Sequence, residues 1–333
     1  MRKGKVLILF LILSASLMTF QLTNVKAATL YVDQSGLCIG AFPDVQTALI
    51  AASPGDTIVF CSNIYETVSR VDINLDVVIN GNGFNWFVED LDVTDETISI
   101  SGSARVLFHD INITLFGTGP GLYRQGIRIY SGATLNMSRI NLTIYLEQSS
   151  RNTYGVFYDD STLGYILESK ILTLGGPSIS GSGVIVLNSN IWILDSILQA
   201  VHNGVAWYVI GNSLGNTINI INSLIRSSYG DGIYLISATA PVTAGQTLII
   251  KYSVLSGYVN SIFAGADQGS SVILNITKSK LYSNSYGIQV AGGGPFSSLA
   301  SFLTLILRDV DIIVYSNTPY QIGIGIYGRS GVA

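Results

Sequence analysis

Few residues of this chain combine the type and spacing that acid–base chemistry needs. Asp159 and Asp160 form an adjacent carboxylate pair, and His109 and His202 are the two histidines of the sequence. Hydrolysis of a glycosidic bond uses two carboxylates roughly 5–9 Å apart, and an imidazole exchanges protons near neutral pH. Asp159, Asp160, His202 and Asp231 are therefore the candidates for catalysis. Solvated turns contain the same residue types, so a purely structural role stays open beside the catalytic one.

Aromatic residues offer a second kind of chemistry, the recognition of sugars. Tyr130, Phe157, Tyr208, Tyr234 and Phe263 follow one another at intervals of 27, 51, 26 and 29 residues. An aromatic ring supplies a large apolar face, and a tyrosine hydroxyl adds a hydrogen-bonding group. We expect these five residues to bind carbohydrate. Packing under a turn or against another subunit is the alternative, because exposed apolar residues serve both purposes.

These intervals belong to a repeat of about 28 residues, which is visible on two tracks. One track is a polar residue followed by aliphatic positions, and the other is a glycine followed by an aliphatic residue. The polar track is led by Asp110, Arg139, Ser169, Ser196, Ser223, Ser253, Ser279 and Asp309. The glycine track consists of Gly126, Gly155, Gly183, Gly204, Gly232, Gly287 and Gly323, with Ser261 at the missing step. A fixed period of 20–50 residues indicates a stacked repeat architecture.

A repeat of this length accommodates three short strands and three turns in each rung. Each strand can pair with its copies in the neighbouring rungs at about 4.8 Å. The sequence therefore predicts an all-β solenoid, a single-stranded parallel β-helix of about nine to ten rungs. Eight rungs carry the clear repeat, and residues 57–103 form one or two degenerate ones.

Strand alternation divides each rung into interior and exterior positions. The expected interior residues are Ile127/Ile129, Val156/Tyr158, Val184/Val186, Val205/Trp207, Ile233/Leu235, Ile288/Val290 and Ile324/Ile326. The expected exterior residues are the five aromatic residues named above, together with Arg128, Asp159, Ile185, Leu187, Ala206, Ile236, Gln289 and Ala291.

The same alignment makes three local predictions. Asp231 holds the position of Asn203 one rung later, so His202 and Asp231 are expected to approach each other. Gly126 and Gly155 are expected at a tight corner with positive φ. The Ser/Asp column of the polar track is expected to form a hydrogen-bonded ladder at a turn, provided that every hydroxyl is paired.

Residues 28–56 precede the repeats and are expected to cap the first rung. Pro43 and Asp44 suit the start of a helix, and the apolar residues of 45–52 fall on one helical face. Ser53-Pro54-Gly55-Asp56 is a strong turn signal before the β-branched segment that follows. A short helix laid over the end of a strand stack would cover unpaired strand edges.

This segment also carries a family resemblance. Asp44-Val45-Gln46-Thr47-Ala48-Leu49, then Ala52-Ser53-Pro54-Gly55-Asp56-Thr57-Ile58-Val59 and Ile64-Tyr65-Glu66, resembles the N-terminal signature of secreted right-handed parallel β-helix proteins with the pectin-lyase-like fold. The resemblance implies that residues 57–333 form right-handed β-helix repeats. It does not choose an activity, because this fold carries lyases, glycosidases, epimerases, adhesins and phage tail fibres alike.

The enzymes of this fold imply residues that the chain mostly lacks. The polygalacturonase-like branch uses several acids with a histidine and an Arg-x-Lys motif, and the sequence has no Arg-x-Lys match. The lyases use a basic residue, often with Ca²⁺ clamping the uronic acid. Here basic residues gather only at Arg124, Arg128 and Arg151, and no acidic cluster suits calcium. We expect no cofactor and no metal site.

The N-terminal segment and the two cysteines indicate that the protein is exported. Arg2, Lys3 and Lys5 precede an apolar run, and small residues surround Ala27, so residues 1–27 are expected to be a secretory signal peptide. An uncleaved anchor is the alternative, although the run is shorter than the ~20 residues of a spanning helix. Cys38 and Cys61 are the only cysteines, and in a secreted chain they are expected to form a disulfide.

The charge balance excludes some partners. The net charge of the whole sequence is −4, and removal of residues 1–27 takes away four basic and no acidic residues, which gives about −8. No basic stripe is present, so nucleic acid and anionic membranes are not expected partners. No apolar run after residue 30 has the length of a membrane span.

These observations predict a secreted or cell-surface, adhesin-like β-helix protein. Its long face would bind a polysaccharide or cell-surface glycan, or a protein partner, or a second copy of itself. The alternative is a carbohydrate-active enzyme, either a polysaccharide lyase or a glycoside hydrolase of the pectin-lyase-like fold. A cleft that holds two acids, or an acid and a base, within reach of one sugar would distinguish the enzyme.

Overall fold

The structure is a computed structural model of the 333-residue chain. It describes residues 27–90, 96–117, 123–146, 152–160, 162–174, 180–210, 215–238, 245–266, 271–292, 302–315 and 322–328. The predicted signal peptide, residues 1–27, lies outside the described part of the chain except for its last residue.

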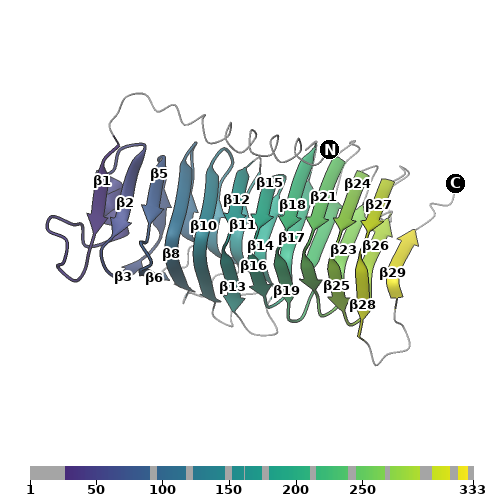
Figure 1. The fold of residues 1–333 in the computed structure, drawn as a ribbon. Coiled ribbons are helices and arrows are strands. Elements are labelled where there is room, and N and C mark those ends of the chain that lie inside the picture. The colour runs from purple at the N-terminus through teal and green to yellow at the C-terminus, as the bar shows by residue number, and fades with distance from the viewer. Residues whose placement is uncertain are drawn as a thin grey trace, which may run out of the picture.

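The chain forms a parallel β-helix in which each turn contributes strands to three faces (Figure 1). The first face contains β1 (Thr29–Val32), β2 (Asp56–Phe60), β5 (Val77–Asn80), β8 (Arg105–Gly117), β10 (Thr134–Leu146), β12 (Leu163–Leu167), β15 (Asn190–Leu194), β18 (Asn216–Ile221), β21 (Gly245–Lys251), β24 (Ser271–Thr277) and β27 (Phe302–Arg308). The second face contains β3 (Ile64–Val68), β6 (Asn85–Asp90), the later halves of β8 and β10, β13 (Lys170–Leu174), β16 (Ile197–Ala200), β19 (Leu224–Ser227), β22 (Val254–Ser256), β25 (Lys280–Ser283) and β28 (Asp311–Val314).

The third face is a separate sheet of ten strands. It contains β4 (Val71–Ile73), β7 (Glu96–Ile100), β9 (Tyr123–Ile129), β11 (Asn152–Tyr158), β14 (Ser180–Leu187), β17 (Asn203–Ile210), β20 (Ile233–Ala238), β23 (Asn260–Ala266), β26 (Tyr286–Gly292) and β29 (Ile322–Gly328). The first two faces form one 19-stranded sheet, because β8 pairs with β5 before the corner and with β6 after it.

The pairing register confirms the predicted fold class. Val156 pairs in parallel with Ile127 on one side and with Val184 on the other, so residues one repeat apart lie side by side. Eight turns, from β8 to β29, carry the regular repeat, and the turns β2–β3–β4 and β5–β6–β7 precede them.

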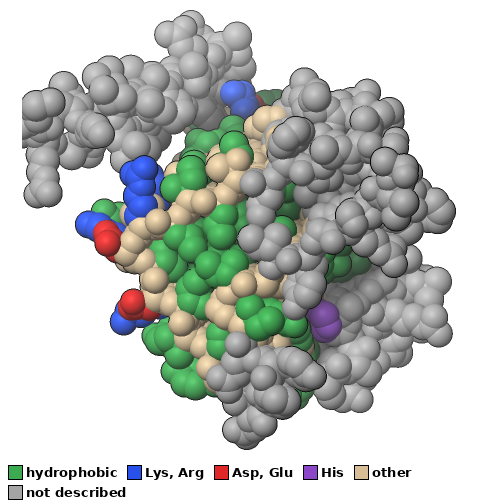
Figure 2. Space-filling view, turned by 90° about the vertical axis from the view of Figure 1, so that its right-hand side faces the viewer, with side chains coloured by type: hydrophobic (Ala, Val, Ile, Leu, Met, Phe, Trp, Pro, Cys, Tyr) green, Lys and Arg blue, Asp and Glu red, His purple; other side chains and the backbone are tan. Residues whose placement is uncertain are grey.

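The predicted interior residues fill the solenoid, with one exception at its end. Those from Ile127 to Val290 are at most 3% exposed. Ile324 was predicted to lie inside, but it is 38% exposed because β29 is the last described strand and has a neighbour on one side only. Figure 2 shows hydrophobic side chains gathered on this end of the molecule. The side chain of Ile326 lies outside the described residues.

The glycine track has a different physical cause from the one predicted. Gly126 and Gly155 do not have positive φ. A Cβ atom on Gly126 would instead lie 2.8 Å from the carbonyl oxygen of Gly155, and one on Gly155 would lie 2.3 Å from that of Gly183. Glycine therefore recurs at these two positions because the carbonyl oxygen of the next turn lies too close to where a Cβ atom would be.

The polar track separates into two columns. Ser169, Ser196, Ser223, Ser253 and Ser279 are buried, and each Oγ accepts a hydrogen bond from the backbone N–H of the preceding turn. Each hydroxyl also donates to the carbonyl two residues earlier, at 2.6–2.8 Å. This is the predicted ladder, which we call the serine ladder.

Asp110, Arg139 and Asp309 were predicted to lead the same column, and this was wrong. The register places each of them one position earlier, beside residues such as Glu168 and Asp195. These positions have positive φ, between 47° and 54° for these five residues, and they form a turn outside the ladder. Arg139 and Asp110 form an ion pair across it at 2.5 Å.

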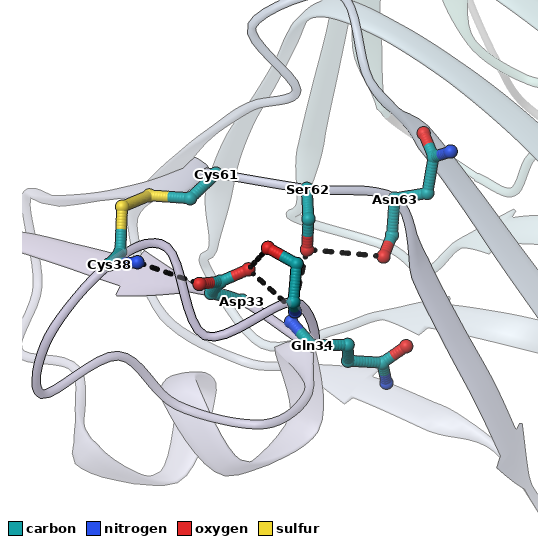
Figure 3. The surroundings of a disulfide bond; sticks show 7 residues. Asp33, Gln34, Cys38, Cys61, Ser62 and Asn63 are labelled. Atoms are coloured by element: carbon teal, nitrogen blue, oxygen red, sulfur yellow. Dashed lines mark hydrogen bonds between the residues drawn. A yellow bond between two sulfur atoms is a disulfide. The ribbon is translucent and has the colours of Figure 1, made fainter.

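The N-terminal cap contains the predicted helix and disulfide. Helix α2 (Val45–Ala51) begins at Asp44, whose side chain accepts a hydrogen bond from the Thr47 N–H, and it buries Val45, Ala48 and Leu49. Cys38 and Cys61 are disulfide-bonded (Figure 3). Asp33 lies beside this bridge and accepts hydrogen bonds from Ser35 and from the Cys38 N–H, which lower the pKa of its carboxyl. The disulfide thus fixes the loop that contains Cys38 to Cys61, which directly follows β2.

Candidate binding face

The outer side of the third face carries the predicted aromatic residues. Phe157, Tyr234 and Phe263 occupy one outward column of this sheet, and Tyr208 occupies the next column. All four side chains are partly exposed. Their placement follows from strand alternation, because the intervening residues Tyr158, Trp207, Leu235 and Ala264 point into the core.

The aromatic rings form two groups that follow one another along the solenoid. The ring centroids of Tyr208 and Tyr234 are 6.1 Å apart, and those of Tyr234 and Phe263 are 5.1 Å apart. Tyr154, which the sequence analysis missed, lies 6.1 Å from Phe157. Its signal was an aromatic residue directly before the glycine track. We refer to these five residues, Tyr154, Phe157, Tyr208, Tyr234 and Phe263, as the aromatic strip.

The rings are stacked on one another, so they do not present a row of free faces. The planes of Tyr234 and Phe263 differ by 14°, and Tyr208 meets Tyr234 at 61°. At such separations each ring covers part of its neighbour's face. A ligand therefore meets ring edges, the remaining exposed surface of each ring, and the tyrosine hydroxyls.

Two of these hydroxyls are open to a ligand. The hydroxyls of Tyr208 and Tyr234 have no hydrogen-bond partner among the described residues. Burial raises the pKa of Tyr208 to about 12, with a smaller contribution from Tyr234 and Tyr154. Burial, together with the charge of Asp231, also raises the pKa of Tyr234. Both phenols are thus protonated at neutral pH and can donate and accept hydrogen bonds.

Ile185 and Ala206 were predicted to lie on the exposed face, and this was wrong. Both point outward in the register, but they are only 2% and 0% exposed. In the register they lie between Phe157 of β11 and Tyr234 of β20. In the outward column, two buried apolar residues, Ile185 and Ala206, therefore separate Phe157 from Tyr234.

A polar cluster lies at the N-terminal end of the same face. Arg128 forms an ion pair with Asp159 at 2.7 Å, and its guanidinium lies 4.3 Å from the Tyr130 ring centroid. The Tyr130 hydroxyl donates to Glu96 at 2.7 Å, and Arg70 lies 3.2 Å from the same carboxylate. Burial, followed by the bond to Glu96, raises the pKa of Tyr130 to about 12.

The structure places the two predicted catalytic carboxylates, Asp159 and Asp160, in different surroundings. Asp159 is held by Arg128, and Asp160 lies in an exposed turn with a φ of 37°. Glu96 and Arg70 were missed because they belong to the degenerate turns, where the sequence repeat is not visible. No signal in the sequence alone connects them with Tyr130.

His202 and Asp231 lie one turn apart, as predicted, and interact electrostatically. The imidazole fits over Gly230, where a Cβ atom would lie 2.7 Å from His202 Nδ1. Asp231 is buried and accepts hydrogen bonds from the N–H and side-chain amide of Asn260, at 3.0 and 2.9 Å. Burial raises the pKa of Asp231, while the bonds from Asn260 and the charge of His202 oppose the rise.

The chemical groups open on this face are thus mainly neutral. Asp159, Glu96 and Asp231 are each ion-paired or hydrogen-bonded within the protein. Within the described ranges, no group of three or more His, Cys, Asp or Glu side chains is arranged to hold a metal ion. None of the described helices is long and apolar enough to cross a membrane.

Comparison with known proteins concerns the fold. No family model matches the chain, and no curated protein sequence matches it. The structure is similar to pectate lyase Pel9A, with 12% identity over 88% of this chain and 81% of that chain and a TM-score of 0.44. It is similar to a polygalacturonase from Erwinia carotovora ssp. carotovora, with 11% identity over 93% and 99% and a TM-score of 0.43.

A third solved structure, bacteriophage CBA120 tailspike protein 3, is 10% identical over 86% of this chain and 56% of that chain, with a TM-score of 0.33. At these identities and TM-scores the likeness carries no argument about activity. The predicted parallel β-helix is confirmed by the strand pairing of the structure itself.

Proposed function

We propose that the protein is an extracellular or cell-surface recognition protein that binds glycan chains along the aromatic strip. One observation carries the proposal. Five partly exposed aromatic residues form the strip on one sheet face, and the hydroxyls of Tyr208 and Tyr234 have no hydrogen-bond partner within the described part of the chain. An apolar surface with a few neutral hydrogen-bonding groups matches the alternating apolar and hydroxyl surfaces of a sugar.

The strip also suits a polymer better than a single sugar. Its members come from β11, β17, β20 and β23, so it follows the long axis of the solenoid (Figure 1). Successive strands are about 4.8 Å apart, and a chain molecule lying along this axis would meet strip residues from β11, β17, β20 and β23 in turn. Each contact is weak, with ~1 kcal/mol per aromatic group, but several contacts on one polymer combine.

The experiment compares the parent with a triple variant, Tyr208→Ala, Tyr234→Ala and Phe263→Ala, on a panel of polysaccharides. We expect the variant to lose retention on the polymer that the parent binds, with little change in thermal stability. The matched control replaces exposed tyrosines away from the strip, Tyr65→Ala and Tyr315→Ala, which should retain binding.

The outcomes separate the candidate functions. Unchanged binding by the triple variant would exclude the strip as the recognition surface. Release of reducing ends by the parent would favour the carbohydrate-active enzyme. Binding of cell-surface protein after complete removal of glycans would favour a protein partner.

A further inference from the structure

We infer that the strip's ligand is a neutral, hydroxyl-rich polysaccharide and not a polyuronate or another anionic polymer. This inference rests on the proposed function and specifies the chemical class that the same surface recognises. Its basis is the distribution of charge around the strip.

The middle of the chain is almost free of charged residues. Residues 171–250 include Tyr208 and Tyr234, and their only charged residues are Asp195, Arg226 and Asp231. Asp195 lies at the corner between the first and second faces, where it accepts a hydrogen bond from Asn222. Arg226 lies on β19 of the second face. Asp231 is therefore the one charge of this segment that lies near the strip, and it is negative.

Cations of the third face lie at its N-terminal end. Arg124 and Arg128, both in β9, are the only Lys or Arg residues in the sequence of its ten strands. Arg128 lies 5.3 Å from the Phe157 ring centroid, at the N-terminal end of the strip, and is already paired with Asp159. From β9 to β17 there are three strand steps, about 14 Å at 4.8 Å per step. This exceeds the Debye length of about 8 Å at physiological ionic strength, so Arg128 attracts an anion at Tyr208 only weakly.

At Tyr208, Tyr234 and Phe263, whose strands contain no Lys or Arg, an anionic sugar would therefore lose hydration without gaining a cation from these strands. Removing a carboxylate from water is costly unless it is paired, and the charge of Asp231 beside Tyr234 adds repulsion. A neutral sugar meets matching groups instead. The hydroxyls of Tyr208 and Tyr234 can donate to and accept from sugar hydroxyls, and the amide of Gln289 continues the column after Phe263.

The test measures the affinity of the mature protein for dextran, mannan and β-glucan and for polygalacturonate and alginate, at 20 and 500 mM NaCl. We expect one neutral polymer to bind at least tenfold more tightly than either polyuronate, with less than a twofold change between the two salt concentrations. Tyr208→Phe with Tyr234→Phe removes two hydrogen bonds and should weaken neutral binding by about tenfold. Tyr229→Phe, off the strip, is the control.

A second variant adds the missing charge. Gln289→Lys places a cation beside Phe263 and should raise polyuronate affinity in a salt-sensitive manner, while neutral binding changes little. Tight, salt-sensitive binding of a polyuronate by the parent, reduced by the Tyr→Phe variants, would overturn the neutral class and keep the strip. If no polymer of either class binds, the proposed function itself fails.

Discussion

The serine ladder makes a quantitative prediction at Ser223. Its Oγ accepts a hydrogen bond from the Ser196 N–H at 3.1 Å and donates to the Ile221 carbonyl at 2.8 Å. Ser223 is 4% exposed, so water does not readily replace the hydroxyl. Ser223→Ala therefore leaves the Ser196 N–H buried without a partner.

The expected cost follows from these two bonds. A buried donor left unsatisfied costs about 1–3 kcal/mol, and a typical hydrogen bond contributes about 1 kcal/mol. Because neighbouring contributions do not simply add, we expect Ser223→Ala to lower the free energy of unfolding by about 2 kcal/mol. The same value corresponds to about 30-fold faster local exchange of the Ser196 amide hydrogen.

Two measurements check this value. Chemical denaturation gives the change in unfolding free energy, and hydrogen exchange reports the Ser196 amide directly. Ser228→Ala is the control, because Ser228 is exposed and should change stability by less than about 0.5 kcal/mol. Parent-like protection of the Ser196 amide in Ser223→Ala would refute the reasoning, since the hydroxyl would then not be the group that satisfies this donor.

Three further perturbations follow from burial and charge. Leu198→Asp places a charge in the dry interior and should cost more than about 3 kcal/mol, while Ile197→Asp, at a 41% exposed neighbour, should cost far less; equal losses of melting temperature would contradict the inside–outside assignment. Burial raises the pKa of Asp231 in the folded protein, so its charge destabilises the fold above that pKa, and this cost disappears as the pH falls through it. Asp231→Asn should therefore raise the melting temperature at pH 7 and lose this advantage in acid. A difference in melting temperature that stays constant at all pH values would argue against burial as the cause. The double substitution Cys38→Ala and Cys61→Ala should lower stability by about 3 kcal/mol, and an unchanged denaturation midpoint would show that the 23-residue closure does not restrain the cap.

The repeat period predicted the architecture from the sequence. Stacked turns place equivalent residues side by side, so spacing alone identified the parallel β-helix and the interior residues from Ile127 to Val290. The outward aromatic columns followed from the same alternation, and their ring separations of 5.1 and 6.1 Å agree with the strand spacing. Local chemistry was equally readable at Asp44, which begins the capping helix.

Tertiary contacts decided what the repeat does not encode. Ile185 and Ala206 point outward in the register and are nevertheless buried, and an alternation pattern contains no information on what covers an outward position. The glycine track is required by the carbonyl of the next turn, which a single turn's sequence does not reveal. Asp110 and Arg139 lie one residue before the ladder position, because Ile111 and Ile140 occupy that position in these two turns.

The candidate site shows the same division. The sequence determined which residues lie in the outward columns, because side-chain direction follows from chain position within a strand. Only the structure brought Arg70 and Glu96 to Tyr130, placed Tyr154 beside Phe157, and engaged Asp159 with Arg128. The contacts of Arg70 and Glu96 with Tyr130 come from the degenerate turns, whose sequences do not show the repeat, so they depend on the path of the chain in three dimensions and not on the period that determines the fold.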